Sequence, residues 1–255
     1  MEKRSGQKKK IFGGSLTVGS WITIANVQMV EIMAGSGFDW LVIDMEHSAI
    51  GIEQALGLIQ VIELAGCVPM VRVGKNDPYL IKRVMDSGAY GVIVPMVNSK
   101  EDAEKAVSAV KYPPKGKRGV GLARAQEYGA YFEGYRKWVE KESIVIVQIE
   151  HIEAIENLEA ILAVPGVDAS MIGPYDLSAS LGYPGNFDRK EMKDALSKYV
   201  KTCIKMKKHA GIHVIPPDAR KLKDKMKQGF KFIVFSFDAM FLTDKIKTEM
   251  KKVRG

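Results

Sequence analysis

The sequence predicts an α/β fold of the (β/α)8 barrel type. Eight short apolar segments recur along the 255 residues, and helical patterns separate most of them. Most of these segments are near-continuous apolar runs, which is typical of strands that are covered on both faces. Strand and helix alternating eight times within about 240 residues is the length and rhythm of a TIM barrel.

The expected strands are 15–24, 38–46, 68–74, 90–97, 143–150, 167–174, 211–215 and 230–238. The expected helices are 26–36, 52–65, 78–87, 99–110, 151–162, 189–209, 217–228 and 239–252. Local signals support two helix starts: Asn76 or Asp77 can cap a helix that has Pro78 in its first turn, and Ser99 with Asp102 resembles a capping box. A doubly wound open sheet is the alternative fold, although no GxGxxG motif follows the first expected strand.

Two longer segments interrupt this alternation, namely residues 112–142 and 177–188. Long loops inside compact domains are often functional, so we expect both to form walls over the barrel mouth. No clean linker is present, which predicts one barrel domain over 13–255. Residues 1–12 are rich in lysine and are expected to form a basic flexible tail.

Composition excludes several classes of protein. The apolar content is 46% and no apolar run approaches the ~20 residues of a membrane span, so no membrane association is expected. Two cysteines without metal-type spacing indicate a reduced, cytoplasmic protein. The net charge is +8, but most lysines outside residues 3–10 lie at helical spacing in the last sixty residues, as on solvated helix faces. Nucleic acid is therefore not expected as a partner.

Polar side chains gather where the expected strands end. They are Asp44, Glu46, His47, Arg72, Gln148, Glu150, Asp176, Ser236 and Asp238. The carboxyl ends of barrel strands meet at one face, where the chemistry of such folds is found. Each residue alone could be a helix cap or an ion-pair partner, and Glu150 could simply begin a helix. Together they indicate an active site.

Glu150 and Asp176 follow neighbouring expected strands. Two carboxylates at one mouth repel each other unless a cation lies between them. Oxygen ligands without histidine or cysteine at ligand spacing favour Mg²⁺, Mn²⁺ or a related divalent ion. His47 is a suitable base near neutral pH, and Arg72 is a fixed cation for a carboxylate or a developing oxyanion. This combination suits chemistry next to a carbonyl, and no lysine inside an expected strand supports an imine route instead.

Several stretches resemble the HpcH/HpaI aldolase family. They are "FDWLVIDMEHSA", "VPMVRVGKNDPYLIKRVMDSGAYGVIVPMV", "YPPKGKRGVGLARA", "VQIEHIEAIENL" and "GVDASMIGPYDLSASLGYPGN", in matching order over residues 13–240. The family includes 2,4-dihydroxyhept-2-ene-1,7-dioate and 2-dehydro-3-deoxyglucarate aldolases. The resemblance implies a TIM barrel, a divalent metal (Mg, Mn or Co), a pyruvate enolate and a small 2-oxo acid as substrate. It also implies a homo-hexamer built as a trimer of dimers that exchange a C-terminal helix.

The resemblance also assigns catalytic roles. His47 in "DMEH" matches the base, and Arg72 in "VRVG" matches the residue that contacts substrate and stabilises the transition state. Asp86 in "RVMDSG" matches the acid that raises the basicity of the histidine. Glu150 and Asp176 match the two metal ligands.

Gln148 and Tyr175 match substrate-contacting positions of the family. Three features depart from the family pattern: Tyr175 stands where a small residue is usual, "GIHVIPP" replaces a smoother apolar strand, and "FIVFSFD" stands where a glycine before the aspartate is usual. These departures concern the aldehyde side of the substrate.

The expected function is therefore that of a class II aldolase, a carbon–carbon lyase that cleaves a 4-hydroxy-2-oxo acid to pyruvate and an aldehyde. Other enolate chemistry remains open, such as decarboxylation, carbon–carbon ligation or CoA-thioester cleavage. So does a non-catalytic barrel that binds a small acid.

Overall fold

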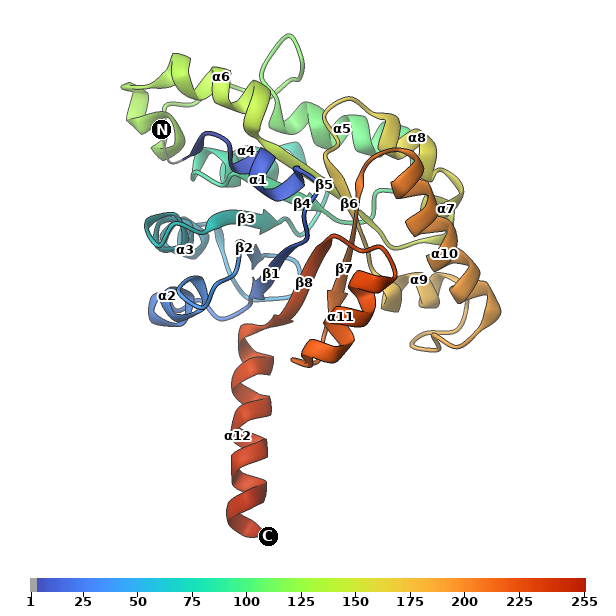
Figure 1. Ribbon diagram of the computed structural model, residues 1–255. Coiled ribbons are helices and arrows are strands. Elements are labelled where there is room, and N and C mark those ends of the chain that lie inside the picture. Colours follow the sequence, from blue (N-terminus) through green and yellow to red (C-terminus); the bar gives the residue numbers. More distant parts are fainter. Residues whose placement is uncertain (1–3) are drawn as a thin grey trace.

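The computed structural model describes residues 4–255 and contains a closed barrel of eight parallel strands in chain order (Figure 1). The strands are β1 (Thr17–Ile22), β2 (Trp40–Asp44), β3 (Val68–Arg72), β4 (Gly91–Val94), β5 (Ile144–Ile149), β6 (Ala169–Ile172), β7 (His209–Val214) and β8 (Phe232–Phe237). Each strand pairs with its neighbour in the chain, and β8 closes the ring on β1. The predicted (β/α)8 barrel is confirmed.

Helices surround the strands. They are α1 (Gln7–Phe12), α2 (Val27–Ala34), α3 (Ile52–Leu64), α4 (Pro78–Asp86), α5 (Lys100–Val110), the 3-10 helix η2 (Arg124–Gly129), α6 (Phe132–Glu142), α7 (Ile152–Glu156), α8 (Leu158–Ala163), α9 (Pro174–Ser180), α10 (Lys190–Lys205), α11 (Ala219–Lys227) and α12 (Asp238–Arg254). The predicted caps are confirmed: Asp77 accepts from the backbone of α4, and Ser99 forms a capping box with Asp102. The expected helix 189–209 ends earlier, and His209 instead opens β7 and is buried.

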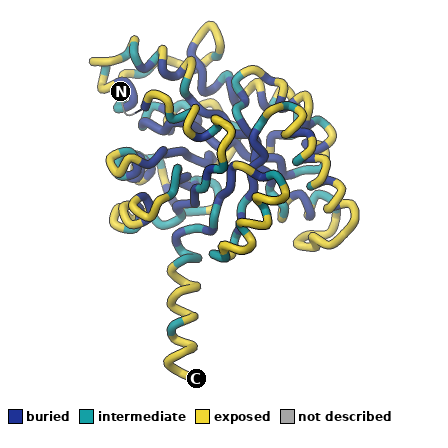
Figure 2. The backbone as a smooth tube through the Cα atoms, viewed as in Figure 1, coloured by how far each residue is buried: buried dark blue, intermediate teal, exposed yellow. Residues whose placement is uncertain are grey.

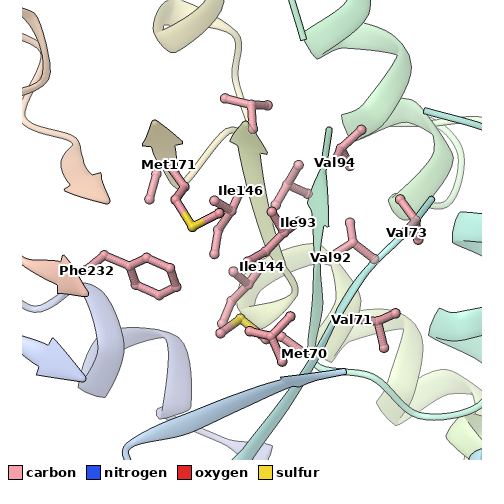
Figure 3. Close-up of a cluster of buried hydrophobic side chains, with 14 of the residues drawn as sticks. Met70, Val71, Val73, Val92, Ile93, Val94, Ile144, Ile146, Met171 and Phe232 are labelled. Atoms are coloured by element: carbon pink, nitrogen blue, oxygen red, sulfur yellow. The ribbon is translucent and has the colours of Figure 1, made fainter. Parts of the chain in front are cut away.

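The barrel interior is filled by side chains from every quarter of the sheet. Figure 3 shows Met70, Ile144, Met171 and Phe232 converging from four strands. Trp40 stacks on Phe232 with ring centroids 4.0 Å apart. At Gly19 an added Cβ would lie 2.0 Å from the Trp40 ring, so this layer packs only with glycine there. The rigid core fixes the strand ends that carry the polar residues.

The N-terminal segment differs from the expected flexible tail. Residues 1–3 lie outside the described part of the chain, but residues 7–12 form α1, whose Ile11 is fully buried. Arg4 pairs with Glu63 at 2.9 Å, and Lys8 pairs with Asp168 at 2.7 Å. The lysine-rich composition concealed one apolar face that packs on the amino end of the barrel.

The segment 112–142 does not cover the barrel mouth, so this prediction was wrong. Helix α5 runs back from the carboxyl ends of the strands, and the chain after it therefore lies at the amino end beside α1 (Figure 1). The Trp138 indole donates to the Arg4 carbonyl at 3.1 Å, and the Tyr135 hydroxyl donates to the Met85 carbonyl at 3.1 Å. The segment 177–188 does border the mouth, where Phe187 lines the cavity described below.

Helix α12 projects away from the barrel and is largely exposed (Figures 1 and 2). Of its seventeen residues only Asp238 is buried. None of the helices formed by residues 4–255 combines the length and the apolar character that crossing a membrane requires.

Candidate active site

The rim at the carboxyl ends of β2 and β3 carries a buried ion pair. The strands are in register so that Asp44 faces Arg72. Arg72 donates from Nε to Asp44 Oδ1 at 2.9 Å and from Nη2 to Oδ2 at 2.6 Å. Burial raises the pKa of the Asp44 carboxyl, but the hydrogen bonds and charge of Arg72 outweigh burial and leave it below its ordinary value. Trp21 packs under the guanidinium with its ring centroid 4.2 Å away. Arg72 is therefore a rigid, permanently charged group.

Glu150 and Asp176 lie on the same rim, as predicted. Glu150 follows β5, and its Oε2 accepts from the Met96 backbone at 2.9 Å while its Oε1 accepts from Gln148 Nε2 at 2.5 Å. Gly173 follows the adjacent β6, and an added Cβ there would lie 2.8 Å from Glu150 Cγ. The missing side chain lets Glu150 lie against the first turn of α9, which carries Asp176.

Electrostatics show that acids crowd this rim. Burial, followed by the charges of Glu46 and Asp176, raises the pKa of Glu150 to about 7, against an opposing backbone hydrogen bond. Burial also raises the pKa of Glu46 to about 7, where Asp44 and Asp176 add to the shift and Arg72 opposes it. Glu46 Oε2 lies 3.2 Å from Arg72 Nη1 but is buried without a well-formed hydrogen bond.

The donor set fits a divalent cation. Glu150 and Asp176 offer hard carboxylate oxygens, and burial, with a smaller contribution from the charges of Glu46 and Asp176, disfavours the charged form of Glu150 in the absence of a counter-charge. Within residues 4–255 no group of three or more His, Cys, Asp or Glu side chains converges on one point. Two protein ligands suffice for a Mg²⁺-like ion, which keeps several positions for water and substrate oxygens.

His47 and Asp86 are not brought together within one chain. The His47 side chain is 66% exposed on the loop after β2, and its Nε2 lies 3.8 Å from Glu46 Oε2. Asp86 ends α4 at the amino end of the barrel, where its Oδ1 accepts from Arg118 Nη2 at 2.5 Å and from Gln126 at 3.2 Å. Within the described chain Glu46, and not Asp86, is the carboxylate beside the predicted base.

A cavity of about 780 Å³ opens above these residues. Asp44, His47, Arg72, Gln148 and Asp176 all line it. Tyr175, which is 55% exposed, stands at its edge against Phe187 with ring centroids 4.9 Å apart. The structure thus gathers every predicted site residue except Asp86 at one mouth.

Two residues of the site had no role assigned from the sequence. Glu46 was named among the polar residues at the strand ends, and the structure places it beside Arg72 and among the other acids. Trp21 supports Arg72 from β1, and nothing in the local sequence distinguishes it from an ordinary core residue.

His213 also lines the cavity, beside the Trp21 ring at a centroid distance of 6.0 Å. Its Nε2 is buried without a hydrogen-bond partner. Burial lowers the pKa of His213 to about 4, and the charge of Arg72 adds to this, while a hydrogen bond to the Ser236 backbone opposes it. Ser236 itself has φ 53°, a left-handed conformation that favours glycine.

The low pKa of His213 predicts a pH-dependent stability. Between about pH 6.5 and 4 the unfolded chain binds a proton that the folded chain does not, so the free energy of unfolding falls as pH drops through this window, by up to about 3 kcal/mol. We expect His213→Leu to remove this part of the loss. Urea unfolding at pH 7.5 and pH 5 measures the loss of unfolding free energy between the two pH values. His151→Gln is the control, at a half-exposed histidine. Equal losses in wild type and His213→Leu would contradict the prediction.

The barrel and its rim of acids beside a fixed arginine define a class of enzymes that stabilise negative charge next to a carbonyl. Comparison with known proteins identifies the family: residues 17–244 match the HpcH/HpaI aldolase/citrate lyase family, and the chain belongs to it. The chain is 37% identical over 242 residues to 2-dehydro-3,6-dideoxy-6-sulfogluconate aldolase of Pseudomonas putida, covering 94% of each chain. It is 36% identical to 2-keto-3-deoxy-L-rhamnonate aldolase of Escherichia coli K12, covering 93% of this chain and 88% of the relative.

A solved structure agrees with this assignment. The HpcH/HpaI aldolase/citrate lyase family protein from Burkholderia cenocepacia J2315 superposes with a TM-score of 0.92 at 29% identity, covering 99% of this chain and 100% of the other. The chain is therefore a carbon–carbon lyase of the aldolase type.

Proposed function

We propose that this chain is a divalent-metal-dependent aldolase that cleaves a 4-hydroxy-2-oxo acid into pyruvate and an aldehyde. The observation that carries the proposal is the placement of Glu150 against Gly173 and near Asp176, on one rim with Arg72. Uncompensated acids are costly in such a place, and their arrangement is explained by a cation that binds there.

Glu150 and Asp176 would hold the ion, with Mg²⁺, Mn²⁺ and Co²⁺ as the candidates. When bound, such an ion acts as a Lewis acid that polarises the 2-oxo group of the substrate. Gln148 and the Met96 backbone both donate to the Glu150 carboxylate and fix its orientation for this task.

The other site residues supply binding and proton transfer. His47, exposed at the mouth, takes the proton from the 4-hydroxyl group. The C3–C4 bond then breaks, the former C4 leaves as an aldehyde, and the bonding electrons pass into the enolate of pyruvate. Arg72, held by Asp44 and Trp21, stabilises the developing negative charge without having to reorganise. A proton added at C3 completes pyruvate.

The test is pyruvate formation measured through lactate dehydrogenase, with and without a chelator. The two named relatives act on deoxy sugar acids, so 2-oxo-3-deoxy sugar acids are the first substrates to assay. We expect pyruvate and a free aldehyde in equal amounts, with activity lost to EDTA and restored by Mn²⁺. Pyruvate accompanied by CO₂ and no aldehyde would favour a decarboxylase instead.

We also propose that the chain assembles as a homo-hexamer from dimers that exchange α12. The support is an exposed apolar stripe along this helix, with Leu242 47%, Ile246 52%, Met250 42% and Val253 78% exposed. Such a stripe on a helix that buries almost nothing of its own chain favours a partner surface.

The assembly is testable by light scattering coupled to size-exclusion chromatography. We expect Leu242→Asp combined with Ile246→Asp to reduce the particle from about six chains to one or two, because two buried charges would be unpaired at the contact. Thr248→Asp, on the opposite side of the same helix, is the matched control and should leave the mass unchanged. An unchanged mass in the double variant would refute the exchange of α12.

A further inference from the structure

The chain just after β1 is held by one buried carboxylate, that of Asp238. Its Oδ2 accepts from the Thr23 backbone at 2.9 Å and from the Ile24 backbone at 2.8 Å. Its Oδ1 accepts from Thr23 Oγ1 at 2.6 Å and from the Ala239 backbone at 2.8 Å. Asp238 is 1% exposed, and all four of these donors are neutral groups. The charge is therefore compensated by fixed dipoles, and three of the four belong to residues 23 and 24.

An irregularity near the end of β8 aims this carboxylate. The pairing of β8 with β1 shifts by one residue before Trp21, which pairs with Phe237, and Ser236 has φ 53° at this irregularity. Strict alternation from Phe232, which points into the barrel, would turn Asp238 inward and Phe237 outward. The extra residue reverses the two faces. Phe237 consequently lines the cavity, and Asp238 turns toward the chain after β1.

The segment that Asp238 holds reaches the active site through Trp21 and Thr23, which both line the cavity. The Trp21 ring lies under the Arg72 guanidinium, with its centroid 4.2 Å away. The pairing of β1 with β2 ends at Ile22, directly before the residues that bind Asp238. A displacement of the chain at residues 23 and 24 would therefore move the ring that supports the arginine.

We propose that Asp238 is a positioning residue, which holds the end of β1 so that Trp21 keeps Arg72 in place for catalysis. The inference rests on the proposed function, in which Arg72 stabilises the developing negative charge. A displaced cation stabilises that charge less, because it must reorganise during the reaction. Asp238 is also the first residue of α12, so the helix that leaves the barrel and the support of Arg72 share one anchor.

The kinetics of isosteric variants test this role. Asp238→Asn presents amide N–H groups to backbone N–H donors, and we expect kcat for pyruvate release to fall about tenfold while KM changes by less than about threefold. Thr23→Val removes one hydroxyl bond and should give a smaller loss, whereas Thr23→Ser keeps the hydroxyl and should retain the wild-type rate. Asp39→Asn is the matched control: Asp39 Oδ2 accepts from the Val18 backbone at 2.9 Å at the opposite end of β1, so kcat should not change.

A double-mutant cycle distinguishes positioning from a general loss of stability. In an Arg72→Lys background, Asp238→Asn should lower kcat by less than about twofold, because the group that it positions is already displaced. Crystal structures of the wild type and Asp238→Asn give a readout that needs no activity. We expect the Trp21 ring to lie farther from residue 72 in the variant than the 4.2 Å of the native chain.

A wild-type kcat in Asp238→Asn, an equal loss in the Arg72→Lys background, or an unmoved Trp21 ring would overturn the inference and leave the aldolase proposal intact. Should Asp238→Asn fail to fold, Thr23→Val carries the same cycle, and a wild-type kcat in that variant is the contradicting result. A wild type that releases no pyruvate, while the Trp21 ring moves in the variant, would overturn the aldolase proposal alone.

Discussion

Substitution of Glu150 by glutamine is expected to reduce metal-dependent pyruvate release by at least about 10²-fold. The variant loses one of two charged ligands, and the Lewis acid that depends on them supplies several kcal/mol of stabilisation to the developing charge. Turnover with saturating Mn²⁺ measures the effect. Glu153→Gln, an exposed acid three residues further on, is the control that should retain activity. Undiminished activity of Glu150→Gln in EDTA would disprove the metal-dependent route.

Protonation of Glu150 is also expected to make the affinity for the metal ion depend on pH. With the pKa of Glu150 at about 7 in the metal-free protein, a proton must leave before the cation binds. Below pH 7 the affinity for Mn²⁺ should therefore fall roughly tenfold per pH unit, and the dependence should weaken in Glu150→Gln. Calorimetric titrations at pH 5.5, 6.5 and 7.5 give the slope. A flat profile in wild type would show that this carboxyl does not bind the ion.

Replacement of Arg72 by lysine is expected to lower kcat by about 10²–10³-fold while changing KM less. Lysine keeps the charge but cannot donate two bonds to Asp44 and a third toward Glu46, so the cation is no longer fixed where negative charge develops. Arg72→Met should in addition lower the free energy of unfolding by about 3–5 kcal/mol, because Asp44 would be left buried and unpaired.

Steady-state kinetics and thermal melting of the two variants separate these effects. Arg83→Lys, at an exposed arginine on α4, is the control for a generic loss of arginine. If Arg72→Lys turned over at the wild-type rate, the guanidinium would be structural only, as the partner of Asp44.

Much of this architecture follows from the sequence because strands covered on both faces must be apolar throughout. The same rule explains the acid pair: a charged residue directly after a buried strand lies at its carboxyl end, and Glu150 and Asp176 follow adjacent strands. Once a barrel of parallel strands is predicted, residues that directly follow two consecutive strands must lie on the same rim. The cap at Asp77 was equally local, since its side chain bonds only to the next two or three residues.

What escaped prediction depends on contacts between distant segments. The segment before β1 has few apolar residues, and besides the buried Ile11 it is held by ion pairs to Glu63 and Asp168, which no local pattern connects to Arg4 and Lys8. Asp86 ends a helix at the far end of the barrel, and its partner Arg118 belongs to a segment whose location was misassigned. The position of a helix end relative to the mouth, and not the residue type, decides whether an acid can serve His47.

The packing of α1 has a consequence for the order of events in turnover. The Phe12 ring lies against Phe232 and His209 at the amino end of the barrel, with ring centroids 5.9 Å and 5.4 Å apart. Because this contact continues the packed interior of the barrel, we expect substrate and products to pass through the cavity above the carboxyl ends of the strands. In the proposed cleavage pyruvate lies at Glu150 and Asp176 and the aldehyde lies nearer the opening, so we expect the aldehyde to leave first. Product-inhibition kinetics should then show pyruvate competing with the incoming substrate.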